Sequence, residues 1–248
     1  MKKTYPILAG AGLLISVAIF ADAQKPAPDL SRDLEIELAL SALPPHLRAE
    51  ATVYVPGDSQ EFEVARKGTN GFHTFVSRND PNAFHGSWPH TEYRDDILVP
   101  IAFDDAGSKA HMPVFIDMAE LRAAGTTAED LKAIINDRYE DGYYRAPDRA
   151  GISYMLAPVF RTYVDPEETD LIATMNVPHY MFYAPGVSNE QIGGKVMSEY
   201  PFMLNRSPAP HGYIIQIVGQ AEKEAINMEY AEMIARLCEV RDVYCLPD

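Results

Sequence analysis

The strand-like segments of this chain fall into two groups on either side of a helical middle, and this order constrains the fold more than any other feature of the sequence. The first group is rich in β-branched and aromatic residues and covers residues 52–55, 62–67, 73–78 and 97–103. The second group covers residues 152–157, 178–184 and 213–218. Hairpin-like pieces outnumber strand–helix–strand units. We therefore expect an α+β fold with a mainly antiparallel sheet, a helical middle section and a C-terminal amphipathic helix.

The helices are predicted from caps and apolar periodicity. The first middle helix covers residues 113–124, and Thr126 and Glu129 form a capping-box pattern at the start of a second helix. The last predicted helix, residues 221–238, is amphipathic, and we interpret its apolar stripe as core packing. Residues 34–43 alternate like a strand, but they consist mostly of Leu, Glu and Ala and precede two prolines, so we interpret them as a helix.

The N-terminal segment reads as a secretory signal. Lys2 and Lys3 precede an apolar run, residues 7–20, and small residues then lead to a predicted cleavage between Ala23 and Gln24. The alternative is a retained membrane anchor, but the run is shorter than the roughly 20 residues that a spanning helix needs. The short basic start and the cleavage pattern are typical of bacteria, and they predict a periplasmic or secreted protein. The expected organisation is a signal peptide (1–23), a linker (24–30) and a single globular domain (31–248).

Composition and charge narrow the possible partners. Apolar residues make up 47% of the chain and charged residues 23%, as in an ordinary globular protein. The formal net charge is −15, which repels phosphate backbones. We therefore expect a small-molecule or protein partner, no nucleic acid, and no stable membrane anchor after cleavage.

The two cysteines, Cys238 and Cys245, lie near the C-terminus. In an oxidising compartment this pair predicts a disulfide that ties the tail to the preceding helix; two free thiols are the alternative. The common catalytic signatures are missing from the sequence: it contains no Gly-x-Ser-x-Gly, His-Glu-x-x-His, Gly-x-x-x-x-Gly-Lys or Gly-x-Gly-x-x-Gly.

A loop at residues 84–92 concentrates side chains that can bind ligands. His85, His90 and Glu92 are candidate ligands for a divalent metal cofactor such as zinc. Trp88 lies between the histidines and would suit the rim of a ligand site. A plain surface loop with solvated histidines is the third interpretation.

The predicted strand at residues 178–185 places His179 and Met181 on one face. The pair would suit copper, since imidazole and thioether both bind that metal, whereas a hydrogen-bonded core histidine is the more common arrangement. Both faces of the strand are apolar, so we expect a central strand that is covered on both sides.

The turn at residues 68–71 predicts a hairpin between the strands 62–67 and 73–78. Ordinary turn chemistry explains its composition; alternatively, the turn presents Asn70 and His73 to a cleft.

Other histidines could join such a cleft. The candidates are His111 and His211, and a cluster of His73, His179 and His211 would form only if their strands are neighbours. Carboxylates for acid–base chemistry, or for solvation alone, occur in two pairs, residues 95–96 and 104–105.

Several short strings in the chain are distinctive: residues 68–72 (GTNGF), 112–115 (MPVF), 151–156 (GISYML), 179–185 (HYMFYAP) and the Asn, Ile, Gly and Gly of 189–194. These strings resemble those of an uncharacterised family of exported bacterial proteins. The resemblance implies export and a single domain, and it brings no activity or catalytic residues.

Two functions follow as hypotheses. The first is an exported soluble protein that binds a small ligand or a partner protein, and the lack of enzyme signatures favours it. The second is an exported hydrolase that uses a metal at His85, His90 and Glu92 or a histidine base such as His73 or His179.

Overall fold

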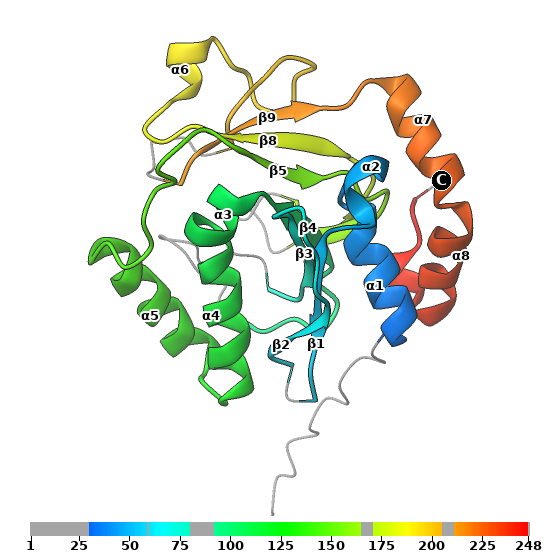
Figure 1. Ribbon diagram of the computed structural model, residues 1–248, viewed down its shortest axis with the longest axis horizontal. Coiled ribbons are helices and arrows are strands. Elements are labelled where there is room, and N and C mark those ends of the chain that lie inside the picture. Colours follow the sequence, from blue (N-terminus) through cyan, green and yellow to red (C-terminus); the bar gives the residue numbers. More distant parts are fainter. Residues whose placement is uncertain (1–29, 59, 80–91, 165–170, 205–210, 248) are drawn as a thin grey trace, which may run out of the picture.

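The computed structural model describes residues 30–58, 60–79, 92–164, 171–204 and 211–247. The predicted signal peptide lies outside the described residues. Seven strands form one mixed sheet in the order β2-β1-β3-β4-β5-β8-β9 (Figure 1). Its strands are β1 (Thr52–Pro56), β2 (Phe62–Arg66), β3 (His73–Ser77), β4 (Val99–Phe103), β5 (Ile152–Met155), β8 (His179–Tyr183) and β9 (Tyr213–Ile217). Neighbouring strands are antiparallel except β1 and β3, which are parallel, so the predicted α+β fold with a mainly antiparallel sheet is confirmed.

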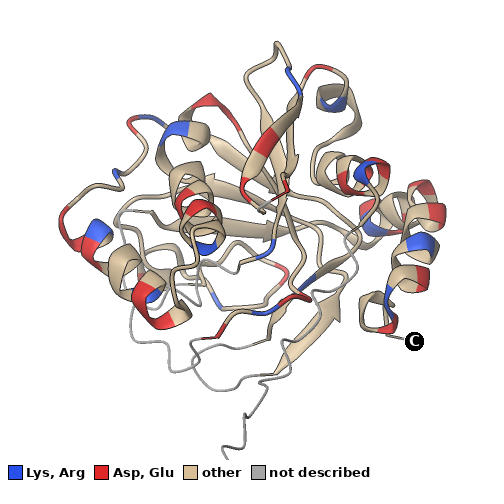
Figure 2. Ribbon diagram, turned by 90° about the horizontal axis from the view of Figure 1, so that it is seen from below, with Lys and Arg blue, Asp and Glu red and all other residues tan. Residues whose placement is uncertain are grey.

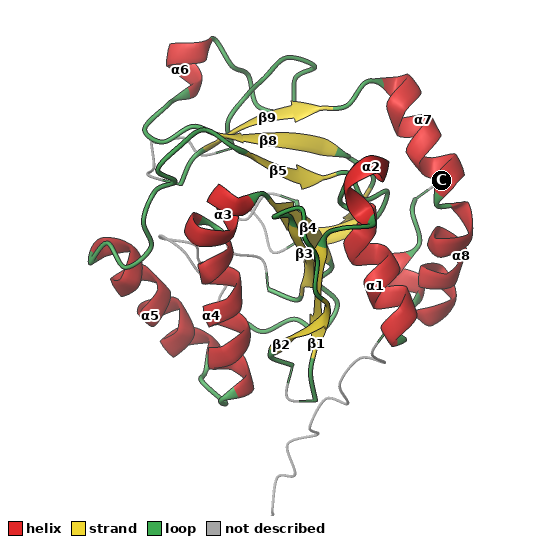
Figure 3. Cartoon of the chain, viewed as in Figure 1, coloured by secondary structure: helices red, strands yellow, loops and turns green. Residues whose placement is uncertain are grey.

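Helices cover both faces of this sheet (Figure 3). On one side lie α3 (Asp105–Ala110), α4 (Met112–Ala123) and α5 (Ala128–Glu140). On the other lie α1 (Arg32–Ser41), α7 (Gln220–Glu229) and α8 (Ala231–Val240), with the short α2 (Pro45–Arg48) after α1. The remaining elements are a two-stranded sheet of β6 (Phe160–Tyr163) and β7 (Ile172–Met175), the short α6 (Asn189–Ile192) and a 3-10 turn (Asp242–Tyr244).

Strand alternation divides the core into two layers. Phe75 of β3 and Phe103 of β4 pack with α4 and α5 in one apolar cluster. Val76 of β3 and Val53 of β1 pack with α1 and α8 in the other. Successive side chains of a strand point to opposite faces, so each strand contributes to both layers.

The hairpin predicted at residues 68–71 is wrong. β1 lies between β2 and β3, and the hairpin joins β1 to β2. The backbone N–H groups of Thr69 and Asn70 bond to the carbonyl of Glu50, at 2.7 and 3.2 Å. Gly68 lies so close to the start of β1 that a Cβ there would be 2.1 Å from the Glu50 carbonyl oxygen. The segment therefore crosses over the start of β1 and leads into β3 parallel to it.

Two helix boundaries differ from the prediction. The N-cap of α5 is Thr127, whose hydroxyl oxygen accepts a hydrogen bond from the Asp130 N–H at 3.1 Å. Thr126 belongs to the end of α4 instead, since its N–H bonds to the Leu121 carbonyl at 3.1 Å. The single helix predicted at 221–238 is broken at Tyr230, which leaves helical geometry.

β8 is a central strand, as predicted, but it is not covered on both sides. Met181 is buried, whereas Phe182 on the opposite face is 44% exposed. The helices on that side pack over other parts of the sheet. The prediction of burial on both sides, which rested on the apolar residues of both faces, was therefore wrong for the face that carries Phe182.

The C-terminal tail is held to α8 by a disulfide between Cys238 and Cys245, with a Cα–Cα distance of 4.5 Å, as predicted. Tyr244, next to the bridge, is buried. Acidic residues lie along the helices with basic ones among them (Figure 2). None of the helices in the described ranges is long and apolar enough to span a bilayer.

Candidate functional site

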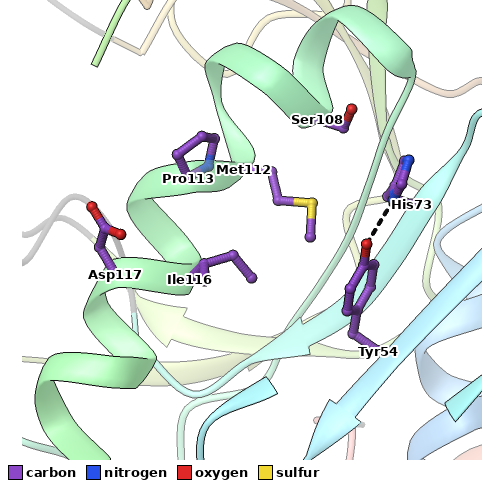
Figure 4. A pocket seen from close by; sticks show the side chains of 7 residues that line it. All are labelled: Tyr54, His73, Ser108, Met112, Pro113, Ile116 and Asp117. Atoms are coloured by element: carbon purple, nitrogen blue, oxygen red, sulfur yellow. Dashed lines mark hydrogen bonds between the residues drawn. The ribbon is translucent and has the colours of Figure 1, made fainter. Parts of the chain in front are cut away.

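An open hollow of about 300 Å³ lies between the strands β1 and β3 and the helices α3 and α4. We call it the Tyr54–His73 groove (Figure 4). Its strand side is polar and its helix side is largely apolar. The lining residues are Tyr54, His73, Ser108, Met112, Pro113, Ile116 and Asp117.

Strand alternation explains why Tyr54 and His73 meet. Val53 and Val55 are buried, with Val53 in the layer next to α1, so Tyr54 between them faces the opposite side. Thr74 pairs with Val53 across the parallel β1–β3 ladder and bonds to the Ala39 carbonyl of α1 at 2.5 Å. His73, one residue earlier, therefore faces the groove beside Tyr54.

The helix side is built by residues one turn apart. Met112 and Ile116 project toward Tyr54 and His73, whereas Asp117 points away from them (Figure 4). Pro113 occupies the first turn of α4, where a missing backbone N–H costs nothing. The arrangement therefore opposes an apolar wall to a hydrogen-bonding wall.

Tyr54 and His73 form a hydrogen-bonded pair. The Tyr54 hydroxyl lies 2.9 Å from Nδ1 of His73, and the two rings stack with centroids 5.8 Å apart. Burial lowers the pKa of His73, against a smaller opposing effect of the Asp105 charge, and burial raises the pKa of Tyr54. At neutral pH both groups are therefore uncharged, and His73 still has Nε2 to offer to a ligand.

Carboxylates near the groove already have cationic partners. Asp105 pairs with Lys109 at 2.9 Å and with Arg149 at 3.3 Å. Asp117 forms an ion pair with Arg138 at 2.5 Å. The groove is therefore close to electrically neutral, with acidic groups at its margin.

The structure gives Asn70 a structural role. Its side-chain oxygen accepts a hydrogen bond from the Phe72 N–H at 3.0 Å, and its amide donates to the Leu47 carbonyl at 2.8 Å. Both ends of the side chain hold the segment before β3. Ordinary turn chemistry is therefore the interpretation that fits Asn70.

The structure does not bring His73, His179 and His211 together. His179 begins β8, is 8% exposed and donates from Nδ1 to the Val177 carbonyl at 2.7 Å. Burial lowers its pKa. His211 lies beyond the opposite end of that strand, where Tyr183 ends it, and four strand residues span about 13 Å. His179 thus has the surroundings of a core histidine.

His111 and His211 instead belong to a second group, which we call the sealed aromatic cluster. Ring centroids of Tyr213, Tyr183 and His211 lie 4.4, 4.6 and 5.4 Å from that of His111. Tyr139 lies 5.2 Å from His211. His111 is 3% exposed, and burial, with a smaller contribution from His211, lowers its pKa to about 3.

A polar network adjoins this cluster. The Tyr183 hydroxyl donates to Asp104 at 2.9 Å, and the Ser153 hydroxyl donates to Tyr183 at 3.2 Å. Gly107 and Gly151 pack so tightly against Tyr183 that a Cβ at either would lie within 2.6 Å of its side chain. Because Tyr183 is packed this tightly, we assign the network to stability.

The predicted metal loop is only partly within the structure. His85, Trp88 and His90 lie outside the described residues. Glu92 is exposed and lies 3.4 Å from Arg94. Within the ranges that the structure covers, no group of three His, Cys, Asp or Glu residues is arranged to hold a metal ion.

The aspartate pairs are mainly structural. Asp96 is 3% exposed and accepts hydrogen bonds from Arg161 at 2.7 Å and Arg94 at 3.1 Å. Asp104 caps α3 through the Gly107 N–H at 2.8 Å. Asp96 and Asp104 are therefore engaged in the fold and not in the groove.

Sequence reasoning named His73 but missed its partners Tyr54, Met112 and Ile116. A signal for Tyr54 existed, since a tyrosine between two valines in a strand faces away from the side that the valines bury. No local signal indicates that α4 lies opposite, because that contact joins distant segments.

Comparison with known proteins identifies no relative: no family model matches the chain, and no curated protein or solved structure matches it. The groove geometry is therefore the basis on which a function is argued.

Proposed function

We propose that this protein is an exported ligand-binding protein that holds a small molecule in the Tyr54–His73 groove. The observation that carries the proposal is the hydrogen-bonded pair on one wall facing Met112 and Ile116 on the other, around an open hollow of about 300 Å³. Small-molecule sites combine such apolar walls with a few placed polar groups. The ligand would have an apolar body and one hydrogen-bonding end.

The charges favour a neutral or cationic ligand. The lowered pKa of His73 keeps its imidazole uncharged at neutral pH, so it does not attract an anion. Asp105 and Asp117 lie at the margin, and the chain carries a net charge of −15. Among the residues that the structure covers, the lining of the groove includes no Lys or Arg, so an anionic head group would find no cationic partner there.

The export part of the proposal is supported by two features. The basic start, apolar run and small residues before Gln24 form a secretory signal, and the Cys238–Cys245 disulfide suits an oxidising compartment. The proposed location is the bacterial periplasm or medium. Mass spectrometry of the protein produced in a bacterial host should find Gln24 at the N-terminus; an intact Met1 would contradict it.

The binding proposal is tested with three molecules of one apolar body and different head groups: hexan-1-ol, hexylamine and hexanoate. Methyl NMR of methionine-labelled protein reports on Met112, whose signal is assigned from Met112→Leu. We expect hexan-1-ol and hexylamine to shift this signal saturably and hexanoate to bind about tenfold more weakly or less.

The matching variant is His73→Phe, which keeps the ring and removes its nitrogens. We expect it to weaken hexan-1-ol binding about tenfold, the value of one lost hydrogen bond. His46→Phe, in α2 and away from the groove, is the control. Equal binding by all three proteins would contradict the proposal.

A second candidate is a hydrolase that uses His73 as its base. It is favoured by one observation: the Ser108 side chain lines the same groove as this neutral imidazole. Turnover of p-nitrophenyl hexanoate that is lost in both His73→Phe and Ser108→Ala would support hydrolysis. If the wild type hydrolyses the ester no faster than either variant, hydrolysis is excluded and ligand binding stands as the proposed function.

A further inference from the structure

A second hollow, of about 230 Å³, lies between the start of α1 and the turn that joins β1 to β2. We call it the Arg78 cleft. It is separate from the Tyr54–His73 groove, and the two share no lining residue. Its charged lining residues are Arg32, Glu35, Asp58 and Arg78, and its apolar ones include Leu30 and Val55.

Arg78 is only partly satisfied. Its side chain is 20% exposed and forms one ion pair, from Nη2 to Glu35, which is itself 3% exposed. In the part of the chain that the structure describes, Nη1 is buried without a hydrogen-bond partner. A guanidinium has several donors in a fixed fork, and a buried donor without a partner is costly. Arg78 also lines the cleft with the exposed part of its side chain, from which the guanidinium can donate to a ligand oxygen.

A second arginine, Arg122, lies next to Arg78. Arg122 donates to the Arg78 carbonyl at 3.5 Å; burial lowers the pKa of Arg122 against the opposing effects of Tyr93 and Asp95, and the Arg78 charge adds the smallest contribution. The guanidinium groups of Arg78 and Arg122 therefore influence each other electrostatically. A ligand carboxylate would add negative charge beside Arg78, and a carboxylate pairs well with the arginine fork.

The β1–β2 turn contributes an acidic side chain to the cleft. Asp58 lies exposed in the β1–β2 turn and lines the cleft, and within the described ranges it forms no ion pair. Gln60 in the same turn has a φ of 70°, a conformation that non-glycine residues adopt at a cost. The turn therefore holds Asp58 and the Gln60 amide at the cleft in a constrained geometry.

We infer that the Arg78 cleft binds a small zwitterion of the α-amino-acid type, with its carboxylate on Arg78, its ammonium toward Asp58 and an apolar side chain against Leu30 and Val55. The four charged side chains of the lining sum to zero, which suits a ligand without net charge. The volume of about 230 Å³ corresponds to roughly eight water molecules at about 30 Å³ each, which is enough for one amino acid.

The test uses the whole protein and three related probes: L-leucine, 4-methylpentanoate, which lacks the amine, and 3-methylbutylamine, which lacks the carboxylate. Backbone amide NMR follows the signals of Gly57, Asp58 and Gln60. L-leucine should bind saturably, and each half-ligand should bind about tenfold more weakly or less. Absence of leucine binding at millimolar concentration, or equal binding by the three probes, would overturn the inference.

Variants separate the two ends of the site. Asp58→Asn, an exposed change that the fold should tolerate, is expected to reduce leucine affinity to that of 4-methylpentanoate, whereas Asp33→Asn on α1 serves as the matched control. Arg78→Gln alone would strand buried Glu35, so it is paired with Glu35→Gln, and the double variant should lose leucine binding while still binding hexan-1-ol in the groove. Unchanged leucine affinity in Asp58→Asn or in the double variant would contradict the assignment.

Discussion

On the same face of the sheet, histidine and tyrosine side chains pack together at two places, and the two places differ in how much open space surrounds them. Tyr54 and His73 are half-buried beside an open hollow of about 300 Å³. His111, between Tyr183 and Tyr213, is 3% exposed and enclosed by rings. Equivalent residue types therefore serve different ends. The sealed aromatic cluster is expected to stabilise the fold, and the Tyr54–His73 groove is expected to bind a ligand.

The largest expected effect that separates the two regions is on acid stability. Unfolded histidine titrates near 6.5, whereas burial lowers the pKa of folded His111 to about 3. Between these values the unfolded chain binds the proton and the folded one does not, so the free energy of unfolding falls as the pH drops below 6.5. The contribution lost is about 2 kcal/mol by pH 5 and on the order of 4 kcal/mol by pH 3.

Urea unfolding at pH 7, 6 and 5 measures this contribution. His111→Phe should lose less stability than the wild type over that range, because it has no imidazole to protonate. His73→Phe should follow the wild type more closely, since the His73 ring is only half-buried. A His111→Phe profile that parallels the wild type would show that His111 titrates normally in the folded protein.

The next effect concerns the packing around Tyr183. A Cβ on Gly107 would lie 1.9 Å from the Tyr183 hydroxyl oxygen. Gly107→Ala should therefore lower the free energy of unfolding by about 3 kcal/mol, measured by urea denaturation. Gly219→Ala is the control, because its Cβ would meet nothing within 4 Å. Similar losses in the two variants would refute the idea that Tyr183 is tightly enclosed.

A smaller effect compares the two tyrosine hydroxyls. Tyr183→Phe removes hydrogen bonds to Asp104 and Ser153 in a buried site and should cost about 1–3 kcal/mol of stability. Tyr54→Phe removes one half-buried hydrogen bond and should cost less than about 1 kcal/mol. Thermal and urea unfolding of the two variants measure these costs. A larger loss of stability in Tyr54→Phe than in Tyr183→Phe would contradict the assignment of Tyr183 to the stabilising cluster.

Local sequence patterns anticipated most of the elements but not their partners. The strands β1, β3 and β8 and the helix α4 were expected within two residues of their ends, because alternation and caps are properties of short segments. The hairpin at residues 68–71 failed because the strand order depends on contacts between Glu50 and the crossing segment. In the same way, His73 stood out as a candidate, while Met112 on a distant helix did not.

The break in the C-terminal helix shows a similar limit. The apolar periodicity of residues 221–238 continues through Tyr230, so the sequence predicts one helix. After the break, α8 packs against α1, and Arg236 pairs with Glu37 at 2.6 Å. Contacts between remote parts of the chain therefore decided both the helix break and the site.

The most direct test of the account is a hexan-1-ol titration of the wild type, Tyr54→Phe and Tyr183→Phe, followed through the Met112 methyl signal. We predict that the wild type and Tyr183→Phe bind with similar affinity, since Tyr183 does not line the groove. Tyr54→Phe should bind about tenfold more weakly, because it loses the hydroxyl that pairs with His73. Equal affinity in all three proteins, or a loss confined to Tyr183→Phe, would contradict the division between an open binding pair and a sealed stabilising cluster.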